Sequence, residues 1–285
     1  MALVIVTMTT HALIAEEKTI VIKKIPMSIP TPALYPQFLG ETVVPVSAQA
    51  AEILDSDSGV VIYAKNPTMK FPMASTTKIM TALTALDYYD MDDILTVEAV
   101  NVPSVIVGFS KGEQVRFEDM LYAMLLPSGN DAAIAIADNY PGGRRVFVEK
   151  MNEKAVVLHL FDSRFADPSG LDEKNITTAR DLARLAAMAM KNPIFSKVVS
   201  TRTTTIVNVS HTNQYYLQNI NRLLGFDGVD GVKTGFTDEA GQVLVTSKLE
   251  KGHRLVFVVL RSTDRFGDTS NLLSAVRGLI SYIKL

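Results

Sequence analysis

The stretch "PMASTTKIMTAL", residues Pro72–Leu83, places a hydroxyl and an ammonium at the start of an apolar helical pattern. Ser75 and Lys78 are three residues apart, so their side chains share one helix face and can meet if the helix begins at Ser75. Lys78 is then either a surface charge or the base that takes the proton from a serine nucleophile. The pair alone does not decide, because S-x-x-K occurs by chance in many helices.

The composition excludes several classes of function. The chain has 285 residues, of which 47% are hydrophobic and 20% charged, enough to bury a large core in one or two domains. A net charge of -2 gives no sign of a nucleic-acid-binding or polybasic membrane surface. The absence of cysteine excludes disulfides, thiolate metal sites and cysteine nucleophiles. The four histidines are scattered and form no HExxH motif, so we expect neither a metal nor another cofactor.

The N-terminal part divides into three predicted segments. Residues 1–15 resemble a secretory signal, with a short apolar run and small residues before Glu16, although no Lys or Arg precedes the run. A first strand or a frayed end is the alternative. Residues 16–44 read as a proline-rich linker, extended and without ladder bonding. The folded domain is predicted to span residues 45–285. A signal-like start predicts export to the periplasm or another extracytoplasmic part of the cell envelope.

Apolar spacing predicts strands at both ends of the folded part and helices in the middle. Helical spacing covers Phe117–Pro127, Asn130–Tyr140, Arg144–Leu160, Thr178–Asn192 and Asn271–Leu285, while strand patterns cover the two arms around Asp57–Gly59, then Thr201–Ser210, "GVKTGFT", "QVLVTSKLE" and "HRLVFVVLRS". Thr178 and Asp181 resemble a capping box. This order predicts an α/β fold of the α+β type: one antiparallel sheet backed by helices, with a helical insert.

Two local motifs allow a functional and a structural interpretation. The segment D-S-D-S-G from Asp55 mimics a calcium loop, but its twelfth position is Asn66 rather than the required glutamate, which favours a hairpin turn. The pattern G-x-S-x-G at Gly108–Gly112 mimics a nucleophile elbow centred on Ser110. An elbow needs a helix directly after it, whereas the next helical pattern starts only near Phe117. A surface loop is the better interpretation of Ser110.

Two distant triplets change the interpretation of Lys78. Ser128-Gly129-Asn130 opens a helix after an apolar segment, and Lys233-Thr234-Gly235 lies on a glycine-flanked strand pattern. Each triplet is common by itself, as a helix cap or a turn. In the order S-x-x-K, S-x-N and K-T-G, the three are the signature of penicillin-binding proteins and β-lactamases. The combination therefore indicates a serine nucleophile with a lysine base.

From about Pro45 to Leu285 the chain resembles the low-molecular-mass penicillin-binding proteins, the serine D-alanyl-D-alanine carboxypeptidases. The likeness rests on "PMASTTKIMTAL", "LLPSGNDAA", "FVEKMNEKA", "DPSGL", "TTARDLA", "NRLL" and "GVDGVKTGFTDEAG", all in family order. It implies a β-lactamase/transpeptidase-like fold with a five-stranded antiparallel sheet flanked by helices and a mostly helical subdomain. It also implies removal of the terminal D-alanine from peptidoglycan pentapeptides ending in D-Ala-D-Ala, through an acyl-enzyme on Ser75, with β-lactam antibiotics as covalent inhibitors.

The resemblance assigns Lys78 as the base for Ser75, a role that requires a neutral amine. The pKa of lysine is about 10.4, so a useful neutral fraction at pH 7 needs a change of about 4 kcal/mol between its two protonation states. Burial lowers a lysine pKa, and so does a neighbouring cation. "MASTTKIM" is apolar enough to supply the burial, and Lys233 is the expected cation.

The other roles follow from the same resemblance. Ser128 relays a proton to the leaving amine, and Asn130 bonds the substrate amide or Lys78. The backbone N–H groups of Ser75 and Phe236 form the oxyanion hole, in the family's manner. Thr234, next to Gly235 in the K-T-G strand, binds the substrate's terminal carboxylate. Arg265 is the candidate for a second carboxylate-binding group.

Departures from the family pattern leave alternatives open. Phe236 stands where relatives often have His or Tyr, and the β-rich domain and membrane-anchoring helix that follow in many relatives have no counterpart, so membrane attachment would depend on the N-terminus. A β-lactamase of the same fold is one rival. Glu173 and Asn175 lack the E-x-x-L-N spacing of its deacylating glutamate, so we expect slow deacylation of penicillins. A non-catalytic penicillin-binding sensor is the other rival.

Overall fold

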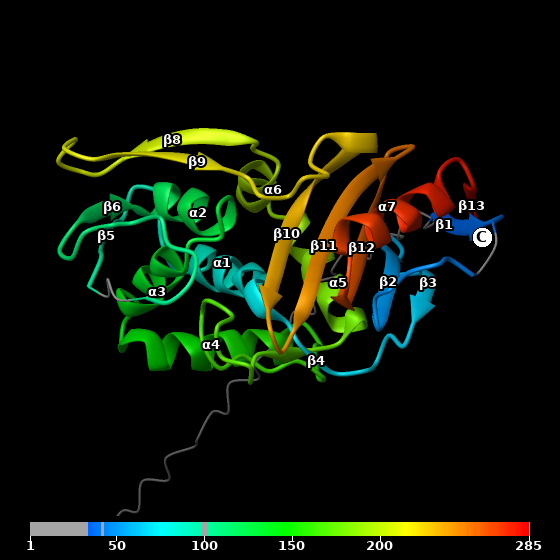
Figure 1. Cartoon of the computed structure of the whole chain (residues 1–285), viewed down its shortest axis with the longest axis horizontal. Helices are drawn as coiled ribbons and strands as arrows, with labels where there is room; N and C mark the ends of the chain where they lie inside the picture. The colour runs from blue at the N-terminus through cyan, green and yellow to red at the C-terminus, as the bar shows by residue number, and fades with distance from the viewer. Residues whose placement is uncertain (1–33, 41–42, 99–101, 285) are drawn as a thin grey trace, which may run out of the picture.

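The computed structural model describes residues 34–40, 43–98 and 102–284, drawn in colour in Figure 1. The signal-like segment and most of the predicted linker lie outside the described residues. The described chain forms a twisted sheet with helices on both faces and, beside one edge of that sheet, a mostly helical part (Figure 1).

The sheet has five antiparallel strands in the order β10-β11-β12-β2-β3. Its strands are β2 (Ala50–Asp55), β3 (Val61–Lys65), β10 (Val229–Thr237), β11 (Gly241–Glu250) and β12 (His253–Ser262). The predicted five-stranded antiparallel sheet is therefore confirmed. Strand β10, which carries the K-T-G triplet, is an edge strand, so one side of its backbone faces away from the sheet.

Helices cover both faces of the sheet, and the alternation along β12 shows how. Val256, Val258 and Leu260 belong to one buried cluster and pack on the side of α5 (Ala179–Met190). Leu255, Phe257 and Val259 belong to a second buried cluster on the side of α7 (Arg265–Val276). A strand that is buried on both faces has a continuous run of apolar residues in its sequence, as β12 does.

The helical part surrounds α1 (Lys78–Leu86), which is buried along most of its length. It contains α2 (Phe117–Leu125), α3 (Asn130–Asp138), α4 (Gly143–Val157) and α6 (Pro193–Val199), together with the two-stranded sheets β5/β6 (Ile94–Thr96, Gln114–Arg116) and β8/β9 (Thr203–Val207, Gln214–Gln218). A further pair, β4/β7 (Phe71–Pro72, Ile176–Thr177), lies beside α1, and a short 3-10 turn (η2) spans Phe226–Gly228. The predicted helical subdomain is confirmed.

Local capping explains one correct helix boundary and one missed helix. The hydroxyl of Thr178 accepts a hydrogen bond from the backbone N–H of Asp181 (3.1 Å), which begins α5 where the capping pattern predicts. The sequence pattern predicts no helix after Asn192, whereas the structure has α6 there. Asn192 is in fact an N-cap, accepting bonds from two backbone N–H groups, and Pro193 occupies the first helical position.

The prediction of one helix over Asn271–Leu285 is wrong. Helix α7 begins earlier, at Arg265, and ends at Val276. Gly278 has φ +70°, a left-handed conformation that terminates helices at low cost. Ile280–Lys284 then form strand β13, which pairs with β1 (Leu34–Phe38). The predicted absence of ladder bonding in the linker is therefore also wrong for residues 34–38.

The calcium-loop-like segment from Asp55 and the G-x-S-x-G motif around Ser110 form a hairpin turn and a surface loop, as the sequence predicts. Ser58 donates from its backbone N–H and its hydroxyl to Asp55 Oδ1 (2.8 and 2.6 Å), which closes the hairpin between β2 and β3. Ser110 is exposed in a turn, with no helix directly after it. Among the described residues no cluster of His, Asp and Glu could hold a metal ion. No helix of the described chain is both long enough and apolar enough to cross a membrane.

Glu52 is a charged residue in the core. It lies on β2 between Ala50 and Leu54, on the face that packs against α5, and is fully buried. Neither carboxylate oxygen has a hydrogen-bond partner in the described chain. Burial raises the pKa of Glu52 to about 7, opposed by Arg180 and Arg184 and assisted by Asp181. Between about pH 4.5 and pH 7, Glu52 is therefore protonated in the folded protein and ionised in the unfolded chain.

A carboxyl pKa raised on folding stabilises the protein at low pH, and this stabilisation is lost as the pH rises from about 4.5 to about 7. We expect Glu52→Gln to remove a pH-dependent part of the free energy of unfolding on the order of 3 kcal/mol. Urea titrations across this pH range measure it. The exposed Glu239→Gln is the control and should follow the wild type. A Glu52→Gln profile parallel to that of the wild type would contradict the prediction.

Candidate active site

The three triplets meet where the edge strand β10 faces the helical part. Ser75 lies in a 3-10 turn, η1 (Ala74–Thr77), directly before α1, and Lys78 is the first residue of α1. Asn130 is the first residue of α3, two residues after Ser128. Lys233 lies in the middle of β10, which packs against η1. Figure 1 shows α1, α3 and β10 converging from distant parts of the sequence.

Glycines hold the turn of Ser75 on two sides. A Cβ on Gly235 of β10 would lie 3.1 Å from Ala74 Cβ and 3.2 Å from Ser75 N. A Cβ on Gly170 would lie 2.0 Å from the carbonyl oxygen of Ala74, and Gly170 also has φ +88°. Ala74 itself has φ +46°, an uncommon conformation for a residue with a side chain. The nucleophile therefore lies on a constrained turn clamped between β10 and the loop of Gly170.

Lys78 is fully buried and donates three hydrogen bonds. Its Nζ lies 3.1 Å from Ser75 Oγ, 2.6 Å from Asn130 Oδ1 and 2.6 Å from the carbonyl oxygen of Ser169. All three acceptors are uncharged, so no carboxylate neutralises the ammonium by direct contact. The contact with Ser75 Oγ is the one that a proton transfer from the nucleophile requires.

Burial lowers the pKa of Lys78 to about 7, against the opposing effect of the charges of Asp167 and Asp131. At neutral pH a large fraction of the amine is therefore neutral. A neutral Nζ accepts a proton instead of donating to Ser75 Oγ. The interpretation of Lys78 as a surface charge is excluded.

Lys233 is the second fully buried lysine. Its Nζ donates to Ser128 Oγ (2.8 Å) and to the carbonyl oxygen of Thr234 (3.0 Å). Burial, then the charges of Lys78 and Arg265, hold its pKa well below the ordinary value. Burial is the largest cause of the lowered pKa of each lysine, so the charge of Lys233, the expected cause at Lys78, is at most a secondary one.

The predicted substrate-binding residues lie along the end of β10. Thr234 is buried and follows Lys233, Gly235 contacts the turn of Ser75, and the Phe236 side chain is 59% exposed. Arg265, at the start of α7, donates from Nη1 to the carbonyl oxygen of Gly235 (2.7 Å). Arg265 is therefore attached to the K-T-G segment, as its predicted role requires.

The sequence interpretation missed two members of the site, Asp167 and Ser169. Ser169 supplies the carbonyl oxygen that holds Lys78. The loop is shaped by Asp167, whose carboxylate accepts bonds from the backbone N–H groups of Ser169, Gly170 and Asp172. Burial alone would raise the pKa of Asp167, but these hydrogen bonds keep it below the ordinary value. The "DPSGL" segment belongs to the family likeness, but a contact made by a backbone carbonyl cannot be predicted from a side-chain pattern.

Glu173 and Asn175, the two loop residues that bear on the β-lactamase alternative, have different surroundings. Glu173 is exposed and lines a surface pocket with Lys70 and Phe161. Asn175 is buried and binds Asp167 through its side chain (2.8 Å). Asp167 is a half-buried carboxylate of this loop, and its oxygens are bonded by backbone and side-chain donors. The expectation of slow penicillin deacylation remains a prediction.

A serine held by a buried lysine, with a second lysine on an adjacent edge strand, defines the class of serine acyl-transfer enzymes that react with penicillin. The family model described as D-alanyl-D-alanine carboxypeptidase, peptidase family S11, matches residues 39–264. The chain belongs to this family and is a serine DD-peptidase.

Individual relatives agree with the family. A D-alanyl-D-alanine endopeptidase of Pseudomonas aeruginosa is 35% identical over 239 residues, covering 81% of this chain and 76% of the relative. A D-alanyl-D-alanine carboxypeptidase of Bacillus subtilis is 34% identical, covering 74% of this chain and 57% of the relative. The Streptomyces K15 DD-transpeptidase superimposes with a TM-score of 0.78 at 31% identity, covering 83% of this chain and all of that one (100%).

The lowered pKa of Lys78 predicts a pH dependence of acylation. The neutral amine is the active base, so the second-order rate of labelling by a fluorescent penicillin should rise about tenfold per pH unit and level off above about pH 7. Time courses at several pH values measure this rate. Lys78→Arg keeps the charge but not the base, and should label at least about 100-fold more slowly. A wild-type rate that still rises steeply between pH 8 and pH 10, roughly where free lysine titrates, would contradict the assignment.

Proposed function

We propose that this protein is a D-Ala-D-Ala carboxypeptidase in which Ser75 is the nucleophile and Lys78 its base. The observation that carries the proposal is the Nζ of Lys78, fully buried, with a lowered pKa and 3.1 Å from Ser75 Oγ. Ser75 Oγ attacks the carbonyl of the penultimate D-alanine while its proton passes to Lys78. The product of this first step is an ester on Ser75, and the terminal D-alanine leaves as the amine.

The leaving amine needs a proton, and Ser128 is the group we assign to deliver it. Ser128 Oγ accepts from Lys233 Nζ (2.8 Å), so Lys233 fixes its position. Asn130 accepts from Lys78 through Oδ1 and donates from Nδ2 to the carbonyl oxygen of Pro103 (3.1 Å), and we assign the same side chain to the substrate amide. The backbone N–H groups of Ser75 and Phe236 bind the developing oxyanion. Water then hydrolyses the ester and regenerates Ser75.

The terminal carboxylate of the substrate is assigned to Thr234 and Arg265. A guanidinium matches a carboxylate in charge and geometry, and Arg265 is held at the K-T-G segment by its bond to Gly235. The substrate is a peptidoglycan stem pentapeptide ending in D-Ala-D-Ala. β-Lactams acylate the same serine and are released slowly, because Glu173 is exposed on the outer side of its loop. Such a reaction takes place outside the cytoplasm, in the cell envelope.

A second candidate is endopeptidase action, in which the leaving amine belongs to a longer group than D-alanine. Two relatives, from Pseudomonas aeruginosa and Escherichia coli, are named D-alanyl-D-alanine endopeptidases. A pocket directly beyond Arg265 offers room for a longer leaving group. The acyl-enzyme chemistry at Ser75 is the same for both activities.

The test compares Ser75→Ala with Ser110→Ala, because Ser110 is the serine of the competing G-x-S-x-G motif. Each protein is incubated with a fluorescent penicillin and, separately, with a peptide ending in D-Ala-D-Ala. We expect Ser75→Ala to abolish both labelling and D-alanine release, and Ser110→Ala to retain both.

Each alternative predicts a different result. Labelling that survives Ser75→Ala would contradict the nucleophile assignment. Labelling of the wild type without release of D-alanine would favour the sensor. Rapid turnover of the penicillin would favour a β-lactamase.

A further inference from the structure

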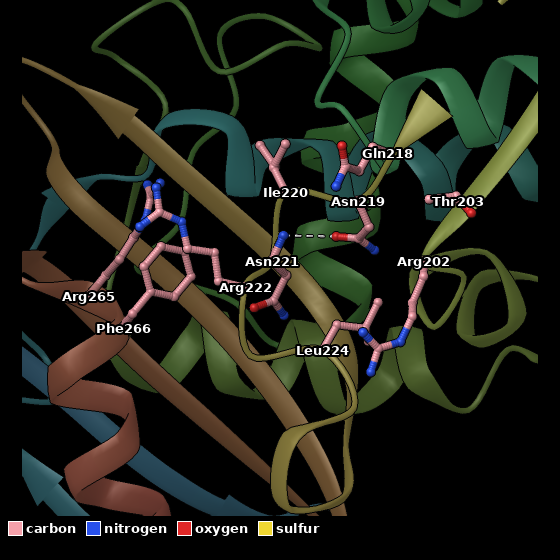
Figure 2. Close-up of a pocket in the computed structure, with 10 residues that line it drawn as sticks. All are labelled: Arg202, Thr203, Gln218, Asn219, Ile220, Asn221, Arg222, Leu224, Arg265 and Phe266. Carbon is pink, nitrogen blue, oxygen red and sulfur yellow. Dashed lines mark hydrogen bonds between the residues drawn. The ribbon is translucent and has the colours of Figure 1, made fainter. Parts of the chain in front are cut away.

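A pocket of about 540 Å³ lies beside Arg265. Its lining is polar and basic, and Figure 2 shows the side chains. The residues that matter here are Arg202, Gln218, Asn219, Arg222, Arg265 and Phe266. No Asp or Glu is among the residues that line it.

The pocket is attached to both halves of the active site. One wall of the pocket is the loop 219–224. In this loop, Ile220 N donates to the carbonyl oxygen of Leu126 (3.2 Å), which lies two residues before Ser128. Asn221 Nδ2 donates to the carbonyl oxygen of Gly231 (3.0 Å), two residues before Lys233. Arg265 belongs to the pocket and to the active site together, through its bond to Gly235. A ligand group in the pocket therefore lies next to the K-T-G segment.

Two guanidinium groups of this pocket lie over one aromatic ring, and neither forms an ion pair with an Asp or Glu among the described residues. The guanidinium carbons of Arg222 and Arg265 lie 5.3 and 5.0 Å from the centre of one ring, that of Phe266. In Figure 2 the two groups overlap in the view near Phe266, with Arg202 on the opposite wall. Burial, and then the charge of Arg222, lower the pKa of Arg265. The Nε of Arg265 is buried with no hydrogen-bond partner in the described chain.

Like charges held together in partly desolvated surroundings repel each other, and an anion between them removes that repulsion. A carboxylate is the natural match, because a guanidinium presents two parallel N–H donors to its two oxygens. The stacking on Phe266 keeps both guanidinium groups in place before a ligand arrives. The pocket is therefore prepared for a carboxylate in addition to the one at the K-T-G segment.

We propose that Arg222, together with Arg265, binds a second carboxylate carried by the side chain of the leaving group. The proposal rests on the proposed function, which places the main-chain carboxylate of the terminal residue at Thr234 and Arg265. The side chain of that residue is then the part of the substrate next to the pocket. A D-alanine methyl group leaves the pocket unfilled, whereas a longer acidic side chain reaches Arg222. Besides D-alanine, the site therefore accepts an acidic D-residue as leaving group in preference to a neutral one of the same size.

Three synthetic peptides with the same acyl part test this, ending in D-Ala-D-Ala, D-Ala-D-Gln and D-Ala-D-Glu. D-Gln and D-Glu have the same size and differ in charge. We expect kcat/KM for D-Glu to exceed that for D-Gln by about tenfold in the wild type, the value of one charge-assisted hydrogen bond. Arg222→Gln should abolish this ratio. Arg145→Gln, an exposed arginine on α4 outside the pocket, is the matched control and should preserve it.

The outcomes separate this proposal from the proposed function. Equal rates for D-Glu and D-Gln in the wild type would overturn the subsite. An equal loss on all three peptides in Arg222→Gln would also overturn it, because Arg222 would then bind the main-chain carboxylate. Binding of the peptides to Ser75→Ala, measured by calorimetry, decides the subsite even if no peptide is hydrolysed. Tighter binding of the D-Glu peptide supports it and equal binding contradicts it, while absence of hydrolysis in the wild type contradicts only the carboxypeptidase.

Discussion

The burial of two lysine side chains against one edge of the sheet is the constraint on which the rest of the site depends. Lys78 and Lys233 are both excluded from solvent, and both bond to uncharged oxygens. Desolvation without a paired carboxylate disfavours the charged form, which converts an ordinary cation into a base near neutral pH. The sheet, the helical part and the loop of Ser169 each supply one wall of this enclosure. Burying the two lysines lowers the stability of the folded protein, but it makes Lys78 basic enough to take the proton from Ser75.

Much of this arrangement was predictable because it is encoded locally. Ser75 and Lys78 are one helical turn apart, so their contact follows from helix geometry once η1 and α1 form. The alternation of both faces along β12 and the cap at Thr178 are likewise local signals. The family likeness then joined the S-x-N and K-T-G triplets to them, since spacing in the sequence says nothing about which distant segments meet.

The errors lie where tertiary contacts override local pattern. The apolar residues after Gly278 have helical spacing, yet they pair as a strand with Leu34–Phe38, at the other end of the described chain. The role of the "DPSGL" loop depends on a backbone carbonyl, which every residue has and no sequence pattern marks. The lowered pKa of Lys78 depends on how completely the fold buries its amine, which is a property of the folded molecule. The sequence does not predict a binding role for Arg222, because only the fold brings it to the ring of Phe266, which it shares with Arg265.

The most direct test of the central claim is the pKa of Lys78 itself. Titration of ¹⁵N-lysine-labelled protein by NMR follows each Nζ, and the spectrum of Lys78→Met assigns the resonance of Lys78. We expect a midpoint near pH 7, produced by burial. A midpoint close to 10.5, the ordinary value for lysine, would show that the buried amine stays charged and would contradict its role as the base.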